Sequence, residues 1–290
     1  MITLLIEERS PERVTDFPGI VDLHELLARP EVQQNTCLWE TGQGRLAAFA
    51  LVDPFFNLAW EQAARLAGSS VEDEIVDWGV ACARRMQQEM GVDSGLDAAC
   101  RIEDTARIDF FKRYGFLPLP DRTVRMIRPL NELIAKPELP AGFQIRSVRG
   151  ESEVEALVEL HRAAFDSENM TVAERLAMMH TPEYDPTLDL VAAAPDGRLA
   201  AFCMGSISAQ ENTLSGRKDG YTDPVGTRPD FQRLGLARAL LLTGLRLLQQ
   251  RGIETARLGT SGENEAMQRA AYSVGFHLEY TKAWFRKKVL

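Results

Sequence analysis

The sequence has no apolar run long enough to cross a bilayer, and no basic segment precedes the short apolar stretch in residues 1–8. A membrane-spanning helix needs about 20 apolar residues, and a secretory signal begins with a basic region. We therefore expect a soluble cytoplasmic protein with no membrane partner. The cysteines are few and lack the spacing of a metal site, so we predict free thiols and no metal: Cys37, Cys82, Cys100 and Cys203.

Positive charge is also scarce. The chain has 33 Lys and Arg against 42 Asp and Glu, which gives a net charge of -9. Nucleic-acid surfaces are basic, so a nucleic-acid partner is not expected. The Walker Gly-Lys-Ser/Thr signature and the Gly-x-Gly-x-x-Gly fingerprint are both missing, which disfavours the common nucleotide-binding modules. At 290 residues and 45% hydrophobic, the chain can bury more than one core.

One stretch, residues 225–240, combines the end of a strand, a tight turn and the start of a helix. Pro229 interrupts a regular ladder and disfavours helix at the residue before it. Apolar residues then recur on one helical face, and Gly252 is a typical stop. That face consists of Leu236, Leu240, Leu241, Gly244, Leu247 and Leu248.

The physical chemistry of this turn favours anion binding. The first amides of a helix lack internal partners, and the helix dipole places partial positive charge there. A phosphate fits this end when no side chain blocks it. Gly235 and Ala237 keep the approach open, and Arg233 and Arg238 add positive charge. An ordinary strand-to-helix turn is an equally good interpretation of these residues alone.

Gln232-x-x-Gly235-x-Ala237 resembles the acyl-CoA pyrophosphate loop, Arg/Gln-x-x-Gly-x-Gly/Ala, of the GCN5-related N-acetyltransferase (GNAT) superfamily. The preceding Val-Gly-Thr-x-Pro and the later Asn264 and Gly-Phe pair occur in the order that this family uses. The clear resemblance covers about residues 189–276, and a fainter one covers the first half. It implies an α/β (α+β) fold of two tandem GNAT-like domains, each a mixed, centrally splayed β-sheet flanked by helices.

We accordingly predict a degenerate N-terminal GNAT-like domain in residues 1–128, a proline-containing linker in 129–142 and a C-terminal acetyltransferase domain in 143–290. The arrangement resembles that of mycothiol synthase, in architecture and not in substrate. An unrelated α/β domain is the alternative for the first half. That half lacks the loop motif, and its long helix starts with Glu72, Asp73 and Glu74, which would repel a pyrophosphate. It is expected to bind no CoA.

Periodicity and turn signals predict the elements. In the first half these are strands at 2–6, 45–52 and 123–127 and helices at 21–28, 70–90 and 108–115. In the second half they are strands at 143–148, 188–194, 199–206, 220–227, 255–260 and 276–289, and helices at 151–165, 171–180 and 264–274. Residues 130–135 are a short amphipathic piece and 211–216 a polar loop. Capping boxes are predicted at Ser70 with Asp73 and at Thr171 with Glu174.

The resemblance places acetyl-CoA in the second half. Backbone amides of residues 233–237 would hold the pyrophosphate, and the backbone of residues 225–227 would pair with the pantetheine arm. One amide of that strand would receive the thioester oxygen. Asn264 would face the arm, or cap its helix. The predicted acetyl-CoA site is Val225, Gly226, Thr227, Gln232, Arg233, Leu234, Gly235, Leu236, Ala237, Arg238 and Asn264.

Candidates for the general base alternate along the strand before the turn. Asp219, Tyr221 and Asp223 share one face if that strand is regular. Family bases often come from this strand, and partial burial can raise a carboxyl pKa toward working pH. Asp223 is the first candidate and Asp219 the second; a structural carboxylate before Pro224 is the alternative.

The proton donor to the departing thiolate is harder to place. Many family members carry Tyr four residues before the glycine of the Gly-Phe corner, a position that here holds Ala271. Tyr272 follows it, and one position turns a helical side chain by about a quarter turn or more. Tyr272 is the candidate donor, with a packing or surface tyrosine as the alternative. His161 and His180 lie on helices that flank the acceptor cleft in this family, and we expect surface or capping roles for them.

The resemblance therefore implies transfer of an acetyl group from acetyl-CoA to a primary amine of a small molecule or a peptide N-terminus. A non-catalytic, CoA-binding regulatory protein is the alternative, because Ala271 replaces the usual tyrosine and no base is convincing. A monomer or a homodimer is expected.

Overall fold

The computed structural model describes residues 1–289 and divides into two compact units. Unit 1 contains residues 1–122 and 213–216 and the chain from residue 281 onward, and unit 2 contains residues 123–212 and 217–280. Strands β5 (Leu117–Pro129) and β12 (His277–Lys287) each contribute to both units. The predicted linker, residues 129–142, groups with unit 2. The division into domains 1–128 and 143–290 stays a prediction.

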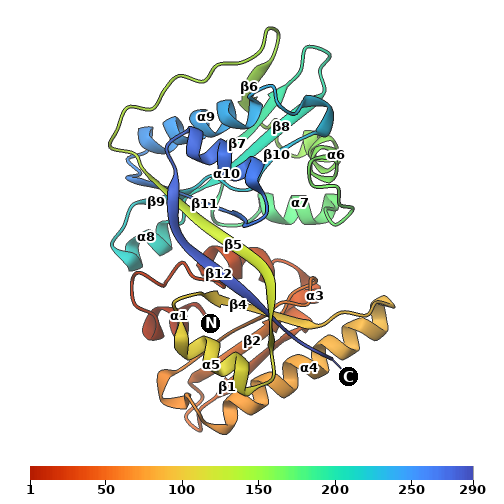
Figure 1. The fold of residues 1–290 in the computed structure, drawn as a ribbon, viewed down its shortest axis with the longest axis vertical. Helices are drawn as coiled ribbons and strands as arrows, with labels where there is room; N and C mark the ends of the chain where they lie inside the picture. The colour runs from red at the N-terminus through yellow and green to blue at the C-terminus, as the bar shows by residue number, and fades with distance from the viewer. Residues whose placement is uncertain (290) are drawn as a thin grey trace. The chain divides into compact units, whose positions relative to one another are not determined.

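Unit 1 is built on an antiparallel sheet in the order β1-β2-β3 (Thr36–Glu40, Leu46–Val52, Leu58–Gln62). The long helix α4 (Ser70–Met90) packs on β2 (Figure 1) and ends at Gly91, whose φ of 67° is left-handed. Strand β4 (Leu96–Arg101) pairs antiparallel with the C-terminal part of β12. The remaining elements are α1 (Ile2–Glu8), α2 (Ile20–Leu27), α3 (Pro30–Gln34), the 3-10 turn η1 (Ala64–Leu66) and α5 (Thr105–Arg113).

The prediction of a strand at residues 2–6 was wrong, because these residues form α1. Leu4 and Leu5 are buried, in a cluster with Phe49 of β2. A short apolar run fits a strand or a buried helix equally well by pattern. Packing against the sheet therefore decides for helix here.

Unit 2 holds a mixed sheet in the order β5-β11-β9-β8-β7-β6, with β10 on β8. All of the pairings within it are antiparallel except β9 with β11. Its strands besides β5 are β6 (Gln144–Ser147), β7 (Tyr184–Ala193), β8 (Leu199–Ser206), β9 (Asp219–Tyr221), β10 (Val225–Thr227) and β11 (Thr255–Ser261). The strand predicted at 220–227 is thus divided: a cis peptide bond joins Asp223 to Pro224 between β9 and β10.

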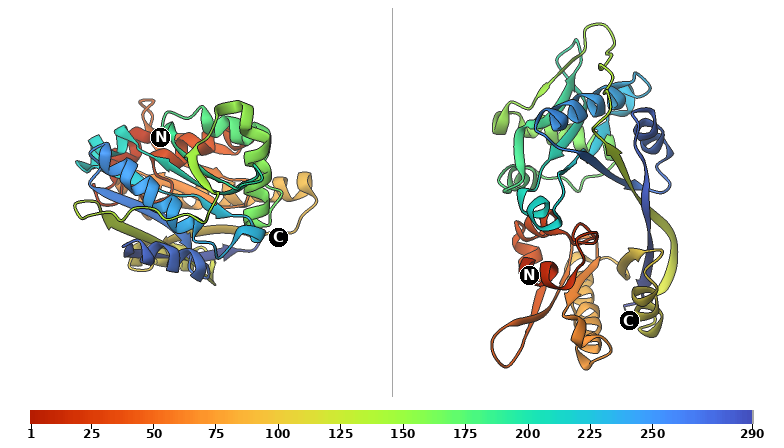
Figure 2. Two further views of the ribbon diagram at one scale, coloured as in Figure 1. Left: turned by 90° about the horizontal axis from the view of Figure 1, so that it is seen from above. Right: turned by 90° about the vertical axis from the view of Figure 1, so that its left-hand side faces the viewer.

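Helices cover both faces of this sheet (Figure 2). Helix α9 (Leu236–Gln250) packs across β7 and β8, and α10 (Glu265–Ser273) contacts α9. Helix α6 (Val154–Phe165), preceded by the turn η2 (Gly150–Glu153), packs on β8 and β10, and α7 (Val172–Met179) contacts α6. Successive side chains of β7 point to opposite faces of the sheet, so Leu190 packs in the cluster under α9 and Val191 packs in the cluster under α6.

Three local predictions have clear outcomes. The capping box of Thr171 and Glu174 is confirmed at the start of α7. The box of Ser70 and Asp73 was wrong, because Ser69 is the N-cap and its hydroxyl accepts from the amide of Val71. Residues 211–216, predicted as a loop, lie mostly in helix α8 (Ala209–Ser215). Polar residues can form such a helix here because Ser208 caps it, accepting from the amide of Glu211 at 3.2 Å.

Candidate active site

The turn between β10 and α9 has the conformation of an open helix start. After η3 (Pro229–Phe231), Gln232 is extended and reaches back to within 3.5 Å of the Thr227 carbonyl oxygen. Arg233 and Gly235 have positive φ values of 61° and 78°. Gly235 is the N-cap of α9, and no side chain caps the helix. The first amides of α9 therefore have no capping side chain of their own to satisfy them.

The charges near this helix start favour an anion. The first turn of α9 contains no acidic residue. Arg233 is exposed, and Arg238, near the start of α9, is half-buried. The nearby carboxylate of Asp230 is engaged by Arg198, at 2.7 Å. The helix dipole, the backbone amides and the guanidinium groups thus all attract an anion.

The corresponding helix start in unit 1 is filled by its own acids. Glu72 in the first turn of α4 is buried and accepts from Gln62 at 3.1 Å and from Arg113 at 2.8 Å. Asp73 accepts from the hydroxyl of Tyr114 at 2.9 Å. These carboxylates occupy the positive end of the dipole, so a pyrophosphate would meet negative charge there.

The backbone of β10 is free to bind on the side away from β8. The Pro224 carbonyl accepts from a β8 amide at 3.1 Å, and the Arg228 amide donates to a β8 carbonyl at 2.9 Å. Gly226 lies between them and is paired with Phe202 of β8. Because backbone groups of a strand alternate in direction, the N–H and C=O of Val225 and Thr227 point away from β8.

The sheet of unit 2 divides at the cis-proline. Strand β11 runs parallel to β9 as far as the pairing of Arg257 with Tyr221. Beyond that point β11 pairs only with β5, and β10 pairs only with β8. The splay expected from the family resemblance is therefore present. The outward amides of β10 face this opening, so they can receive the amides of an extended ligand.

Asp223 stands where the two strands separate. One of its carboxylate oxygens accepts from the Gly259 amide of β11 at 3.1 Å. Arg125 of β5 lies 3.5 Å from the same oxygen. The Asp223 side chain is 23% exposed, and its other carboxylate oxygen, Oδ1, is buried. Sequence reasoning missed Arg125, because its strand is distant in the chain and carries no local signal.

Asp219 and Tyr221 occupy a different environment from Asp223. Asp219 is buried and pairs with Arg257 at 2.7 Å and Arg217 at 3.0 Å. Burial alone would lower the pKa of the Arg257 guanidinium. The carboxylates of Asp219 and Glu279 have the larger effect, so its pKa is raised. The Tyr221 hydroxyl donates to Glu211 at 2.7 Å, and burial raises its pKa.

On α10, Asn264 is the N-cap, and its side chain accepts from the amide of Met267 at 3.0 Å. Ala271 is fully buried in the core. Tyr272 is 51% exposed. The one-residue shift thus places the tyrosine ring toward solvent, and its role as proton donor stays a prediction.

The two histidines differ in surroundings. His180 is exposed and lies 3.0 Å from Glu151, as expected of a surface residue. His161 instead packs at a tilt against Phe165 and Phe202, and it lines a cavity of about 20 Å³ with Pro224. Burial, assisted by the charge of Arg175, lowers the pKa of His161. Such a cavity has room for about one water molecule.

Within residues 1–289, no helix is long and apolar enough to cross a membrane. The same residues contain no group of three or more His, Cys, Asp or Glu side chains placed to hold a metal ion. The four cysteines are free thiols, and three of them are buried.

Comparison with known proteins agrees with this geometry. Residues 154–276 match the profile of the acetyltransferase (GNAT) family. A mycothiol acetyltransferase of Pseudarthrobacter chlorophenolicus is 26% identical over 185 residues, which are 62% of this chain and 56% of that protein. One of Kineococcus radiotolerans is 34% identical over 147 residues, 49% of this chain and 45% of that protein. The chain spans about half the length of the curated relatives that it matches.

Solved structures extend the likeness to both units. A GCN5-related N-acetyltransferase from Sphaerobacter thermophilus has a TM-score of 0.66 at 22% identity, covering 88% of this chain and 81% of its own. A tandem GNAT protein from the clavulanic acid biosynthesis pathway has a TM-score of 0.65 at 12% identity, covering 97% of each chain. Sequence identities this low show only that the fold is shared. The profile match assigns residues 154–276 to the GNAT family, and the fold of the whole chain is similar to that of a solved tandem GNAT protein.

Proposed function

We propose that the protein transfers an acetyl group from acetyl-CoA to a primary amine, with the reaction in unit 2. The observation that carries this is the uncapped start of α9 beside a splayed β10. Its residues fit the cosubstrate: the amides of residues 233–237 suit a pyrophosphate, and Arg233 and Arg238 add charge. Leu234 is exposed on this loop, whereas Leu236 is buried and anchors the helix.

The same geometry supports the position of the acyl end. Acetyl-CoA supplies a thioester, and its pantetheine arm carries amides. The outward N–H and C=O groups of Val225 and Thr227 match those amides as an added strand would. Gly226 keeps this strand close to β8 and α6, because a Cβ there would lie 2.5 Å from the Phe202 ring and 2.9 Å from Ala164. An amide of residues 225–227 then stabilises the negative charge that develops on the thioester oxygen.

Asp223 is our candidate for the base. It is next to β10, its side chain is partly exposed, and it accepts a hydrogen bond from the Gly259 amide. It would take the ammonium proton through water, leaving a neutral amine to attack the thioester carbon. Asp219 is the second candidate, although its two ion pairs favour a positioning role on the strand that leads to Asp223. Tyr272 keeps its assignment as the proton donor to the departing thiolate, and Tyr272→Phe should then lower kcat without changing KM.

The acceptor is proposed to be a small-molecule amine or a peptide N-terminus. The curated relatives are named mycothiol acetyltransferases. The amine that those enzymes acetylate therefore belongs in the first substrate panel, beside simple amines, amino sugars and short peptides.

Release of free CoA thiol from acetyl-CoA, measured against that panel, tests the proposal. We expect at least one amine to stimulate release. Asp223→Asn should lower kcat with acetyl-CoA binding retained. Asp196→Asn is the matched control, because Asp196 is an exposed hairpin aspartate that pairs with Arg198 at 2.8 Å. Failure of acetyl-CoA to bind the wild-type protein would refute the proposal.

A CoA-binding protein without catalysis is the second candidate. Two observations favour it: Ala271 is buried where the family often has tyrosine, and the Tyr272 ring is half exposed. Tight acetyl-CoA binding, with no transfer to any amine and no effect of Asp223→Asn, would support this alternative.

A further inference from the structure

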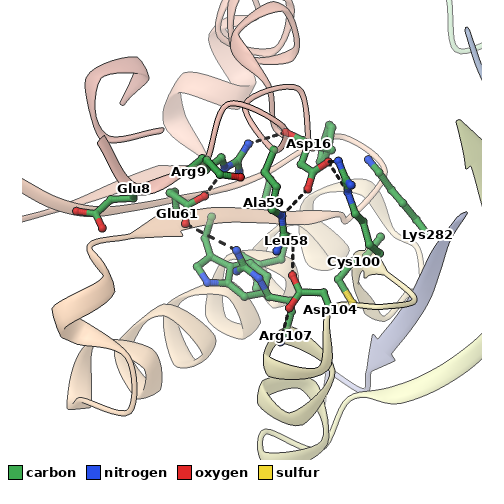
Figure 3. Close-up of a pocket in the computed structure, with 16 residues that line it drawn as sticks. Glu8, Arg9, Asp16, Leu58, Ala59, Glu61, Cys100, Asp104, Arg107 and Lys282 are labelled. Carbon is green, nitrogen blue, oxygen red and sulfur yellow. Dashed lines mark hydrogen bonds and ion pairs between the residues drawn. The ribbon is translucent and has the colours of Figure 1, made fainter. Parts of the chain in front are cut away.

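Unit 1 contains a pocket that the proposed reaction does not use. It has a volume of about 160 Å³ and lies between β3, β4 and the start of α5 (Figure 3). Asn57, the residue before β3, forms a parallel bridge with Asp97 of β4, and the Asp97 amide donates to the Phe56 carbonyl at 2.9 Å. The two strands then belong to separate sheets. The pocket therefore fills a splay in unit 1 like the one between β10 and β11 in unit 2.

The lining is rich in cations. Five basic side chains face four acidic ones, in a chain whose net charge is -9. The basic residues are Arg9, Arg13, Arg101, Arg107 and Lys282, and the acidic residues are Glu8, Asp16, Glu61 and Asp104.

Two of these acids hold arginines in place. Asp16 accepts from Arg101 at 2.6 Å and from Arg13 at 2.9 Å. Asp104 pairs with Arg13 as well. Burial would raise the pKa of Asp16 and Asp104, but hydrogen bonds and charge from these arginines outweigh it and lower both pKa values. The carboxylates stay ionised, and Arg13 and Arg101 are fixed before any ligand arrives.

Arg107 is different. Its guanidinium lies 4.2 Å above the Trp60 ring, and its nearest carboxylate, on Glu61, is 3.8 Å away. That distance exceeds a hydrogen bond. Glu61 is instead engaged by Arg9, at 2.5 Å. Among the contacts of residues 1–289, the side chain of Arg107 makes no hydrogen bond, so its fork of donors is available to a ligand.

The ligand has to be small. Unit 1 has no open helix start at α4, because Glu72 and Asp73 fill its first turn. A CoA pyrophosphate would have no amides to hold it there. An anionic group must instead be recognised within the splay by side chains.

We propose that this pocket binds a small oxyanion, a carboxylate or phosphate group of a metabolite, through Arg107 stacked on Trp60 and beside Arg13 and Arg101. A planar guanidinium pairs with either oxyanion through two parallel hydrogen bonds. The acetyl-CoA site proposed in unit 2 uses none of these residues, so the two ligands would occupy separate sites.

Titration calorimetry at low ionic strength tests this assignment, with inorganic phosphate in one arm and acetate or succinate in the other. We expect one class to bind the wild-type protein at millimolar concentration or tighter. Arg107→Gln should weaken that binding at least tenfold, and Arg107→Lys should recover part of it. Arg45→Gln is the matched control, because Arg45 is 67% exposed and does not line the pocket.

Acetyl-CoA binding, measured on the same variants, should be unchanged, and their thermal unfolding should match that of Arg45→Gln, which shows that unit 1 is folded. Equal anion affinity in Arg107→Gln and wild type overturns the proposal. So does a wild-type protein that binds neither class, or competition between the anion and acetyl-CoA for one site.

Discussion

Substitution of Gly235 offers the sharpest test of the acetyl-CoA site. Gly235 has a φ of 78°, and no heavy atom lies within 4 Å of the position that a Cβ would take, so a side chain there points into open space. Gly252, just beyond the other end of α9, has a φ of 76° and equally open surroundings. Glu placed at either position bears the same backbone strain, of about 1–2 kcal/mol. Only at Gly235 does its carboxylate lie at the proposed pyrophosphate site.

The magnitudes separate the two variants. Acetyl-CoA at about 100 times its Kd stabilises the native state by about 2.7 kcal/mol. For a domain of this size that raises Tm by about 5–10 °C. One pair of like charges about 4 Å apart costs about 4 kcal/mol at an effective dielectric constant near 20. The repulsion is therefore large enough to cancel the whole ligand effect in Gly235→Glu.

The assay is thermal unfolding with and without acetyl-CoA. Both variants should start from a similarly lowered Tm because of the shared strain. Gly252→Glu should then show the full acetyl-CoA shift, and Gly235→Glu none. An equal shift in the two variants would refute the placement of the pyrophosphate at the start of α9.

Three further predictions concern the surroundings of the site. Gly226→Ala should lower the free energy of unfolding by about 1–3 kcal/mol in chemical denaturation, because its Cβ would collide with the Phe202 ring. Asp219→Asn should lower the free energy of unfolding by about 1.5–3 kcal/mol in the same measurement, because Arg257 loses one charged partner but keeps Glu279; a stable variant with reduced kcat would instead favour Asp219 as the base. The lowered pKa of His161 means that the unfolded chain binds the proton more readily, so stability should fall as pH drops below about 6.5, and His161→Gln should flatten that slope in Tm against pH.

Much of unit 2 could be predicted because its signals are local. The glycine and proline positions around Gly235 specify a turn whose backbone the structure reproduces, and Thr171 with Glu174 caps α7 as expected. The division of the strand at the cis Asp223–Pro224 bond was not predicted. A proline in sequence shows where a ladder must change, but not whether the chain bends or crosses to a new partner.

The rest depended on contacts between distant residues. No periodicity could show that residues 2–6 form a helix, because only burial beside Phe49 decides it. Arg125 meets Asp223 through the pairing of β5 with β11, which local sequence does not encode. The pocket of unit 1 was missed for the same reason: Arg13, Arg101 and Arg107 come from three separate segments and look like ordinary surface charges in sequence.

The two units share an architecture but differ in where their charged side chains lie. In each unit two parallel strands separate, and a helix begins after the first of them. In each unit an Asx side chain caps the helix that follows the second strand: Asp104 in unit 1 and Asn264 in unit 2. In unit 2 the helix start is bare and the charge at the fork is a carboxylate, Asp223. In unit 1 the helix start carries the carboxylates of Glu72 and Asp73, and five basic side chains line the fork together with four acidic ones. Because charge sets which end of a splay can accept an anion, we expect the first unit to exclude a nucleotide at the position where the second is proposed to bind one, and to accept a small anion where the second holds its proposed base.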